Sequence, residues 1–270
     1  MSGLKPEKHI LFVVIAGVLA AVGLFSLPKY VVQNEAGEQP AQSSSETTTT
    51  EKEPHLQLSE QQDQALAEIK NSSKDPLDIY QDLATFFAGA NMYDSSAFYA
   101  EKRASEINNE QEWLMTGDYY YQAYSLSLNP VTQEEFAEKA RSAYQKALEI
   151  NPNQLHARTN TAMTYVTSAS PMQAIMMLRQ VLEINPRYVP AIMSMGALSM
   201  QSGQYDRAVS RFKQALAIDE GNLNAQLGLA YSLIETGEKD KAKSILEGLS
   251  EIGLDDVLQN EVDKTLESLK

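Results

Sequence analysis

Hydrophobic and small residues recur along residues 111–250 with two periods. The short period is three to four residues, which places apolar side chains on one face of an α-helix. The longer period appears when AYQKALEINP at 143–152 returns as MLRQVLEINP, ending at Pro186, and as RFKQALAIDE, ending at Glu220. A small residue keeps the same step of 34 positions at Ala140, Ala174, Ala208 and Ala242. This pattern predicts a stack of helix pairs and not a single globular core.

Two helix starts precede these repeats, within residues 58–110. Ser59 and Gln62 have the spacing of a capping box, so we expect a helix to begin there. Asp75-Pro76 is a second start, because aspartate suits the N-cap and proline suits the first helical position. The helices that follow resemble a degenerate repeat, as expected at the end of a repeat array.

The chain ends in an amphipathic segment, residues 251–270. Its apolar residues are spaced four, four and three positions apart, at Leu258, Val262, Leu266 and Leu269. This spacing puts them on one helical face. We therefore expect a helix that caps the open end of the stack.

The first regular repeat opens with Trp113, followed four residues later by Gly117 and seven residues later by Tyr120. This spacing resembles the first half of a tetratricopeptide (TPR) repeat, and the resemblance covers about residues 76–250. It implies an all-α fold, in which antiparallel helix pairs over residues 111–250 stack into a right-handed α-solenoid.

The first repeat departs from the family pattern by extra residues between Tyr120 and Ala140. They predict a longer first helix. Thr132 and Glu135 then have the spacing of a capping box for the second helix.

The resemblance also implies a partner-binding groove on the concave side. In the family, groove residues lie one, five and eight positions after the tryptophan position. These offsets give Leu114, Asp118, Tyr121, Thr159, Met163, Val166, Met193, Ala197, Met200, Leu227, Tyr231 and Ile234.

This predicted groove is apolar and rich in methionine and tyrosine, which favours a peptide or an amphipathic helix of a partner protein. It offers His156 and Asn160 but no lysine or arginine, so it is not expected to grip a terminal carboxylate. Two alternatives stay open: these side chains pack only against neighbouring helices, or residues 59–71 fill the groove.

Residues 10–27 form an uncharged apolar run that is long enough for a membrane span. As a helix they cover roughly 27 Å, close to the hydrocarbon thickness of a bilayer. The alternative is a cleaved signal peptide, with small residues at 21–23, although the run exceeds the usual signal core. Lys5 and Lys8 precede the run and Lys29 follows it, which predicts a cytoplasmic N-terminus over residues 1–9.

Residues 28–57 are rich in serine, threonine, glutamate and glutamine. Such a composition cannot bury enough apolar surface to offset ordering, so we expect a disordered linker. The layout predicts a single-pass protein of a bacterial inner membrane, with its TPR domain in the periplasm or outside.

The composition disfavours several classes of partner and activity. The net charge is −14, which disfavours nucleic acid as a partner. Cysteine is absent and the three histidines are far apart in sequence, so we expect no metal site and no cofactor. Motifs for phosphate loops, dinucleotide binding and zinc proteases are missing, which argues against an enzyme.

The sequence therefore predicts a membrane-anchored scaffold or adaptor that mediates protein–protein interaction. One alternative is a chaperone of cytochrome c maturation or of another envelope assembly process, because anchored TPR proteins of that pathway have a similar layout. Self-association into a larger assembly is a further possibility.

Overall fold

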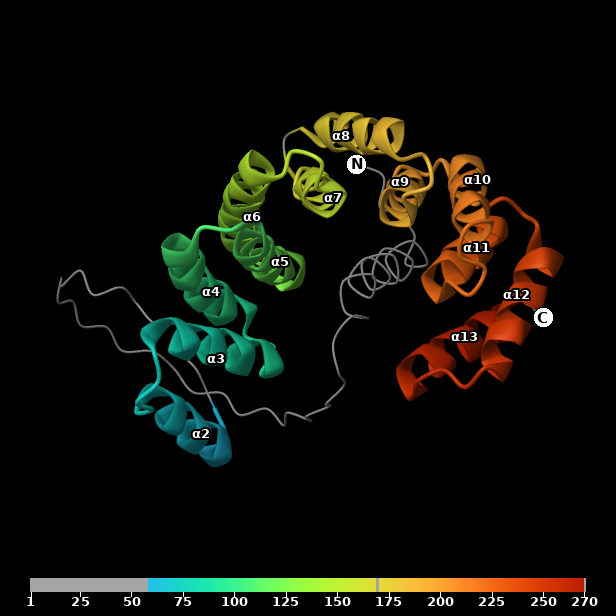
Figure 1. Ribbon diagram of the computed structural model, residues 1–270. Coiled ribbons are helices and arrows are strands. Elements are labelled where there is room, and N and C mark those ends of the chain that lie inside the picture. The colour runs from blue at the N-terminus through green and yellow to red at the C-terminus, as the bar shows by residue number, and fades with distance from the viewer. Residues whose placement is uncertain (1–57, 169, 270) are drawn as a thin grey trace.

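The computed structural model describes residues 58–168 and 170–269, and all regular elements within them are α-helices (Figure 1). The predictions for residues 1–9, 10–27 and 28–57 lie outside the described residues. Among the helices of the described part, none is both long enough and apolar enough to cross a membrane.

The described residues form twelve helices in chain order. They are α2 (Glu60–Lys70), α3 (Pro76–Gly89), α4 (Tyr93–Ile107), α5 (Glu110–Leu126), α6 (Pro130–Ile150), α7 (Leu155–Met163), α8 (Pro171–Ile184), α9 (Val189–Gln201), α10 (Tyr205–Leu216), α11 (Leu223–Glu235), α12 (Lys239–Glu251) and α13 (Asp256–Ser268).

Each helix packs mainly on its neighbours in the chain, and the helices follow an arc (Figure 1). Helices α5, α7, α9 and α11 lie on the inner side of the arc, and we call this side the inner face. Helices α6, α8, α10 and α12 lie on the outer side (Figure 1). The expectation of an all-α solenoid built from helix pairs is confirmed for the described residues.

Capping residues begin the helices where the sequence indicates. Ser59 and Gln62 form the complete capping box of α2, with Ser59 N–H donating to Gln62 Oε1 at 2.9 Å. Asp75 accepts from Leu77 N–H before α3. The expected capping box at Thr132 is wrong, because α6 begins at Pro130 and Asn129 Oδ1 accepts from the first N–H groups.

Small residues let the paired helices approach closely. The four alanines that mark the 34-residue step, Ala140, Ala174, Ala208 and Ala242, are all fully buried. Gly117 on α5 faces the ring of Tyr144 on α6, and a Cβ at Gly117 would lie 2.5 Å from that ring. No other residue fits there without moving the tyrosine, so this position needs glycine.

A second aromatic ring joins two successive repeats. Phe212 on α10 is 2% exposed and lies against both Gly196 on α9 and Gly228 on α11. A Cβ at Gly228 would approach Phe212 Cζ to 2.5 Å. The ring therefore packs against backbone on two inner helices at once.

The N-terminal helix α2 lies at one end of the arc, next to α3 (Figure 1). Leu66 and Ile69 pack against the cluster that contains Leu83 and Phe87. Its apolar stripe thus contacts α3, and the structure does not lay this segment along the inner sides of α7, α9 and α11.

Helix α13 lies at the other end of the arc and covers the last repeat. Val262 is fully buried in the same cluster as Leu246 and Leu249 of α12. The Tyr231 hydroxyl donates to Glu261 Oε1 at 2.8 Å. Helix α13 therefore covers the apolar surface that α11 and α12 present at this end of the arc.

The first helix of the second repeat is shorter than its counterparts. Helix α7 has 9 residues, whereas α9 and α11 have 13 each. Four threonines and a serine occur between residues 159 and 168, and such residues are poor helix formers because their hydroxyls bond nearby backbone groups. Thr164 Oγ1 donates to the Thr161 carbonyl at 2.7 Å, and Ser168 Oγ to the Tyr165 carbonyl at 2.8 Å.

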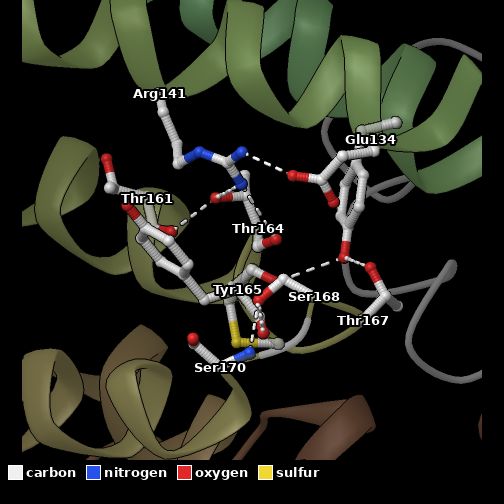
Figure 2. A network of polar contacts seen from close by, with 10 residues as sticks. Glu134, Arg141, Thr161, Thr164, Tyr165, Thr167, Ser168 and Ser170 are labelled. Carbon is white, nitrogen blue, oxygen red and sulfur yellow. Dashed lines mark hydrogen bonds and ion pairs between the residues drawn. The ribbon is translucent and has the colours of Figure 1, made fainter. Parts of the chain in front are cut away.

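A polar network from α5 and α6 holds the turn that replaces the missing part of α7 (Figure 2). Arg141 donates to Glu134 Oε1 at 2.7 Å and to the Thr164 carbonyl at 3.4 Å. Its guanidinium also lies 4.8 Å from the centre of the Tyr165 ring. On α5, the Tyr124 hydroxyl donates to the Met163 carbonyl at 3.3 Å. Arg141 and Tyr124 thus each satisfy a backbone carbonyl at the end of α7.

The glycine contacts give a matched prediction. Gly228→Ala should destabilise the protein by about 1–3 kcal/mol, because its methyl group collides with the buried Phe212 ring. Gly248→Ala is the control, since it lies within α12 with nothing within 4 Å of a new Cβ. It should stabilise by about 0.5–1 kcal/mol through helix propensity. Urea unfolding followed by circular dichroism measures both, and midpoints that move in the same direction would contradict this packing.

Candidate partner-binding face

The predicted groove residues divide by burial. Five of the twelve are buried, namely Thr159, Met193, Met200, Leu227 and Tyr231. All but Thr159 belong to the hydrophobic cluster around Phe212. These side chains pack between helices, so they contribute to the fold and present little surface to a partner.

The other seven predicted residues are half-buried and form the accessible part of the inner face. They are Leu114, Asp118, Tyr121, Met163, Val166, Ala197 and Ile234. Val166 lies in the turn after α7 and not on a helix, because α7 ends at Met163. The role of this face in binding stays a prediction.

A polar cluster occupies the inner face where α5, α6 and α7 meet. Asp118 Oδ1 accepts from the Tyr144 hydroxyl at 2.7 Å and lies 2.6 Å from His156 Nε2. Asn160 Nδ2 donates to the same oxygen at 3.3 Å and to Tyr144 Oη at 3.0 Å. One carboxylate thus ties three helices together.

Burial and charge shift the ionisation of this cluster. Burial, reinforced by the Asp118 charge, holds the pKa of Tyr144 well above its usual range. The hydrogen bond to Asp118 raises the pKa of His156, although burial opposes the shift. Burial and Asp118 also raise the pKa of Tyr188, which precedes α9. The tyrosines therefore stay neutral donors, and His156 binds a proton more readily than a free histidine.

Part of this cluster follows from the sequence. Asp118, His156 and Asn160 were expected on the concave side, but the hydroxyl of Tyr144 was not, because its position holds packing side chains such as Phe212 in other repeats. The tyrosine at position 144 could have indicated this polar contact, since a buried phenolic hydroxyl usually needs a hydrogen-bond partner.

The inner helices carry few basic residues. Helices α5, α7, α9 and α11 contain no lysine, and their one arginine is Arg158. Its guanidinium donates twice to the Pro152 carbonyl, at 2.9 and 2.6 Å. Among the acidic residues, Glu112 is buried against Arg103, whereas Asp118 remains 42% exposed.

A shallow hollow of about 420 Å³ lies at the start of α5. Its lining comprises Asn109, Glu110, Gln111 and Leu114. Glu110 accepts from Asn151 and Gln154 at 2.9 and 2.7 Å, so its carboxylate is held in place. Within the part of the chain that the structure describes, no group of three acidic or histidine side chains is placed to bind a metal ion.

Comparisons with known proteins agree with this geometry. Residues 199–259 match the family model described as Tetratricopeptide repeat. A thermophilic TPR protein of Thermus thermophilus has a similar structure, with a TM-score of 0.51 and 17% identity over 64% of this chain and 91% of that one. The fold is a TPR-type α-solenoid.

Other solved structures superpose less closely. MamA has a TM-score of 0.45 and 17% identity over 64% of this chain and 88% of its own. MamA from Desulfovibrio magneticus RS-1 has a TM-score of 0.47 and 14% identity, over 67% and 97% of the two chains. No curated protein is detectably similar in sequence.

The His156–Asp118 pair predicts a pH-dependent stability. Because the folded pKa of His156 is raised, the pair stabilises the TPR fold fully below the ordinary value of about 6.5, and this contribution is lost as the pH rises through the folded pKa. The difference in unfolding midpoint between the wild type and His156→Gln should be larger at about pH 5.5 than at about pH 8.5. Equal differences at both values would show that the pair contributes no charge interaction.

Proposed function

We propose that this protein is a membrane-anchored TPR scaffold that binds a peptide or helix of another protein on its inner face. The observation that carries the proposal is the combination of half-buried apolar side chains with a fixed polar cluster on rigid helices. Leu114 and Met163 provide apolar contact beside Asp118 and Asn160. Such a mixture suits an amphipathic partner better than a small polar ligand.

The anchor is part of the same proposal. Residues 10–27 are uncharged and apolar over 18 positions, and a short basic stretch precedes them. A helix of this length spans the hydrocarbon core with its backbone groups satisfied internally. We propose a single pass through a bacterial cytoplasmic membrane, with the TPR domain on the outer side and residues 28–57 as the tether.

The experiment uses the full chain, tagged at its C-terminus, in membranes washed with alkaline carbonate and then dissolved in mild detergent. The chain should stay with the washed membranes, and partner proteins recovered with it are identified by mass spectrometry. The double variant Leu114→Ala and Met163→Ala should reduce recovery of the principal partner by about tenfold, because two central apolar contacts are lost.

The matched control is Met172→Ala with Met176→Ala on the outer helix α8. These methionines are 63% and 55% exposed, so the control truncates two apolar side chains on the opposite side of the arc. Recovery should be unchanged. Loss of the partner in the outer variant alone would contradict binding at the inner face, and release of the chain by carbonate would contradict the anchor.

A further inference from the structure

We propose that the partner segment is basic and amphipathic, and that Asp118 receives one of its lysine or arginine side chains. This inference rests on the proposed function, because it names the chemistry of the segment that the inner face binds. It follows from how the Asp118 carboxylate is held, from the charges around it and from the apolar side chains beside it.

The cluster fixes Asp118 without using the whole carboxylate. Its three hydrogen bonds converge on Oδ1, from Tyr144, His156 and Asn160, while the side chain is 42% exposed. The hydrogen bonds from these three residues leave Oδ2 available to another donor. A carboxylate oriented in advance by these donors loses little side-chain entropy when it pairs with an incoming cation.

The described residues place no lysine or arginine against Asp118. The inner helices contain no lysine, and Arg158 is occupied by the Pro152 carbonyl. Among the residues that the structure describes, His156 is the one basic group that contacts Asp118, and it carries a charge only when it is protonated. Apart from Arg187, which is exposed in the turn before α9, the other lysines and arginines of the four regular repeats lie on the outer helices α6, α8, α10 and α12.

This distribution gives the two sides of the arc different charge. Basic residues lie on the outer helices, where some of them pair with acidic residues of the same helix. Lys139, for example, lies 2.9 Å from Glu135 on α6. The inner face has Asp118 and Glu235 without such partners on the same helices. Opposite charges steer association and set the register of a bound helix, so a positive segment fits this face and an acidic one does not.

The surroundings of Asp118 also suit a long aliphatic cation. Tyr121 and Leu114 are half-buried on the same helix, and Met163 is half-buried on α7. Leu114 and Tyr121 pack against the cluster that contains Tyr144, whose hydroxyl donates to Asp118. A lysine or arginine stem can pack on such side chains while its charge meets the carboxylate.

The test uses two synthetic peptides of about 18 residues, enough for five helical turns. Both carry leucine on one face, and the other face carries lysine in the first peptide and glutamine in the second. Binding to the full chain in neutral detergent is measured by fluorescence anisotropy, with empty micelles as the blank. The wild type should bind the lysine peptide about tenfold more tightly than the glutamine peptide.

Asp118→Asn is the decisive variant, because asparagine keeps an acceptor oxygen for Tyr144 and Asn160 but removes the charge. It should weaken binding of the lysine peptide by about five- to tenfold and change binding of the glutamine peptide by less than about twofold. Glu247→Gln on α12 is the control for net charge, since it makes the same change on an outer helix. It should leave both affinities within about twofold.

Three outcomes would overturn the inference. Asp118→Asn and Glu247→Gln could have equal effects, which would indicate general charge attraction. Asp118→Asn could weaken both peptides equally, which would indicate a structural role alone. The wild type could bind both peptides equally and lose both with Leu114→Ala and Met163→Ala; the inner face would then bind apolar segments, and the proposed function would stand without the basic anchor.

Discussion

The fold depends on close contact between a large side chain on one helix and a small residue on its partner. Tyr144 against Gly117, and Phe212 between Gly196 and Gly228, bring ring carbons to within about van der Waals distance of a neighbouring backbone. A single added methyl group has no space at these points. Because each repeat touches mainly its neighbours, the same contact made several times determines how the whole arc is built.

This constraint separates the residues that build the array from those that can recognise a partner. The conspicuous repeat positions, such as Ala140 and Ala208, are completely buried. The accessible chemistry lies on the first helices, where Asp118, His156 and Asn160 meet around one carboxylate. Tyr144 belongs to both sets of residues. Its ring packs on Gly117, as the repeat pattern requires, and its hydroxyl donates to Asp118 in the polar cluster.

Much of the fold could be predicted from sequence because it depends on local and periodic signals. The 34-residue step located the helix pairs, and the caps at Ser59 and Asp75 fixed two helix starts. The early end of α7 was not predicted. The TPR pattern implies a helix of full length here, and the low helix propensity of the threonines after residue 158 was not weighed against it. Asn129 was missed as the cap of α6 in favour of Thr132, although Asn129-Pro130 carries its own start signal.

The candidate site was less predictable than the fold. Counting along a helix gives the direction of a side chain but not its depth, which is set by the neighbouring helices. Met193 and Leu227 have the offsets of groove residues and yet are buried in the core. Leu114 has the same offset as these two residues, and Asp118 has the offset of the buried Tyr231, yet Leu114 and Asp118 are only half-buried.

The central claim is that recognition occurs on the inner face, beside the Asp118 cluster. Site-specific photo-crosslinking in living cells tests it most directly, with a photoreactive phenylalanine analogue placed at Met163 on α7 or at Met176 on the outer helix α8. Binding at the inner face should give a covalent adduct with a partner protein from position 163 and none from position 176. An adduct from position 176 with none from position 163 would contradict it.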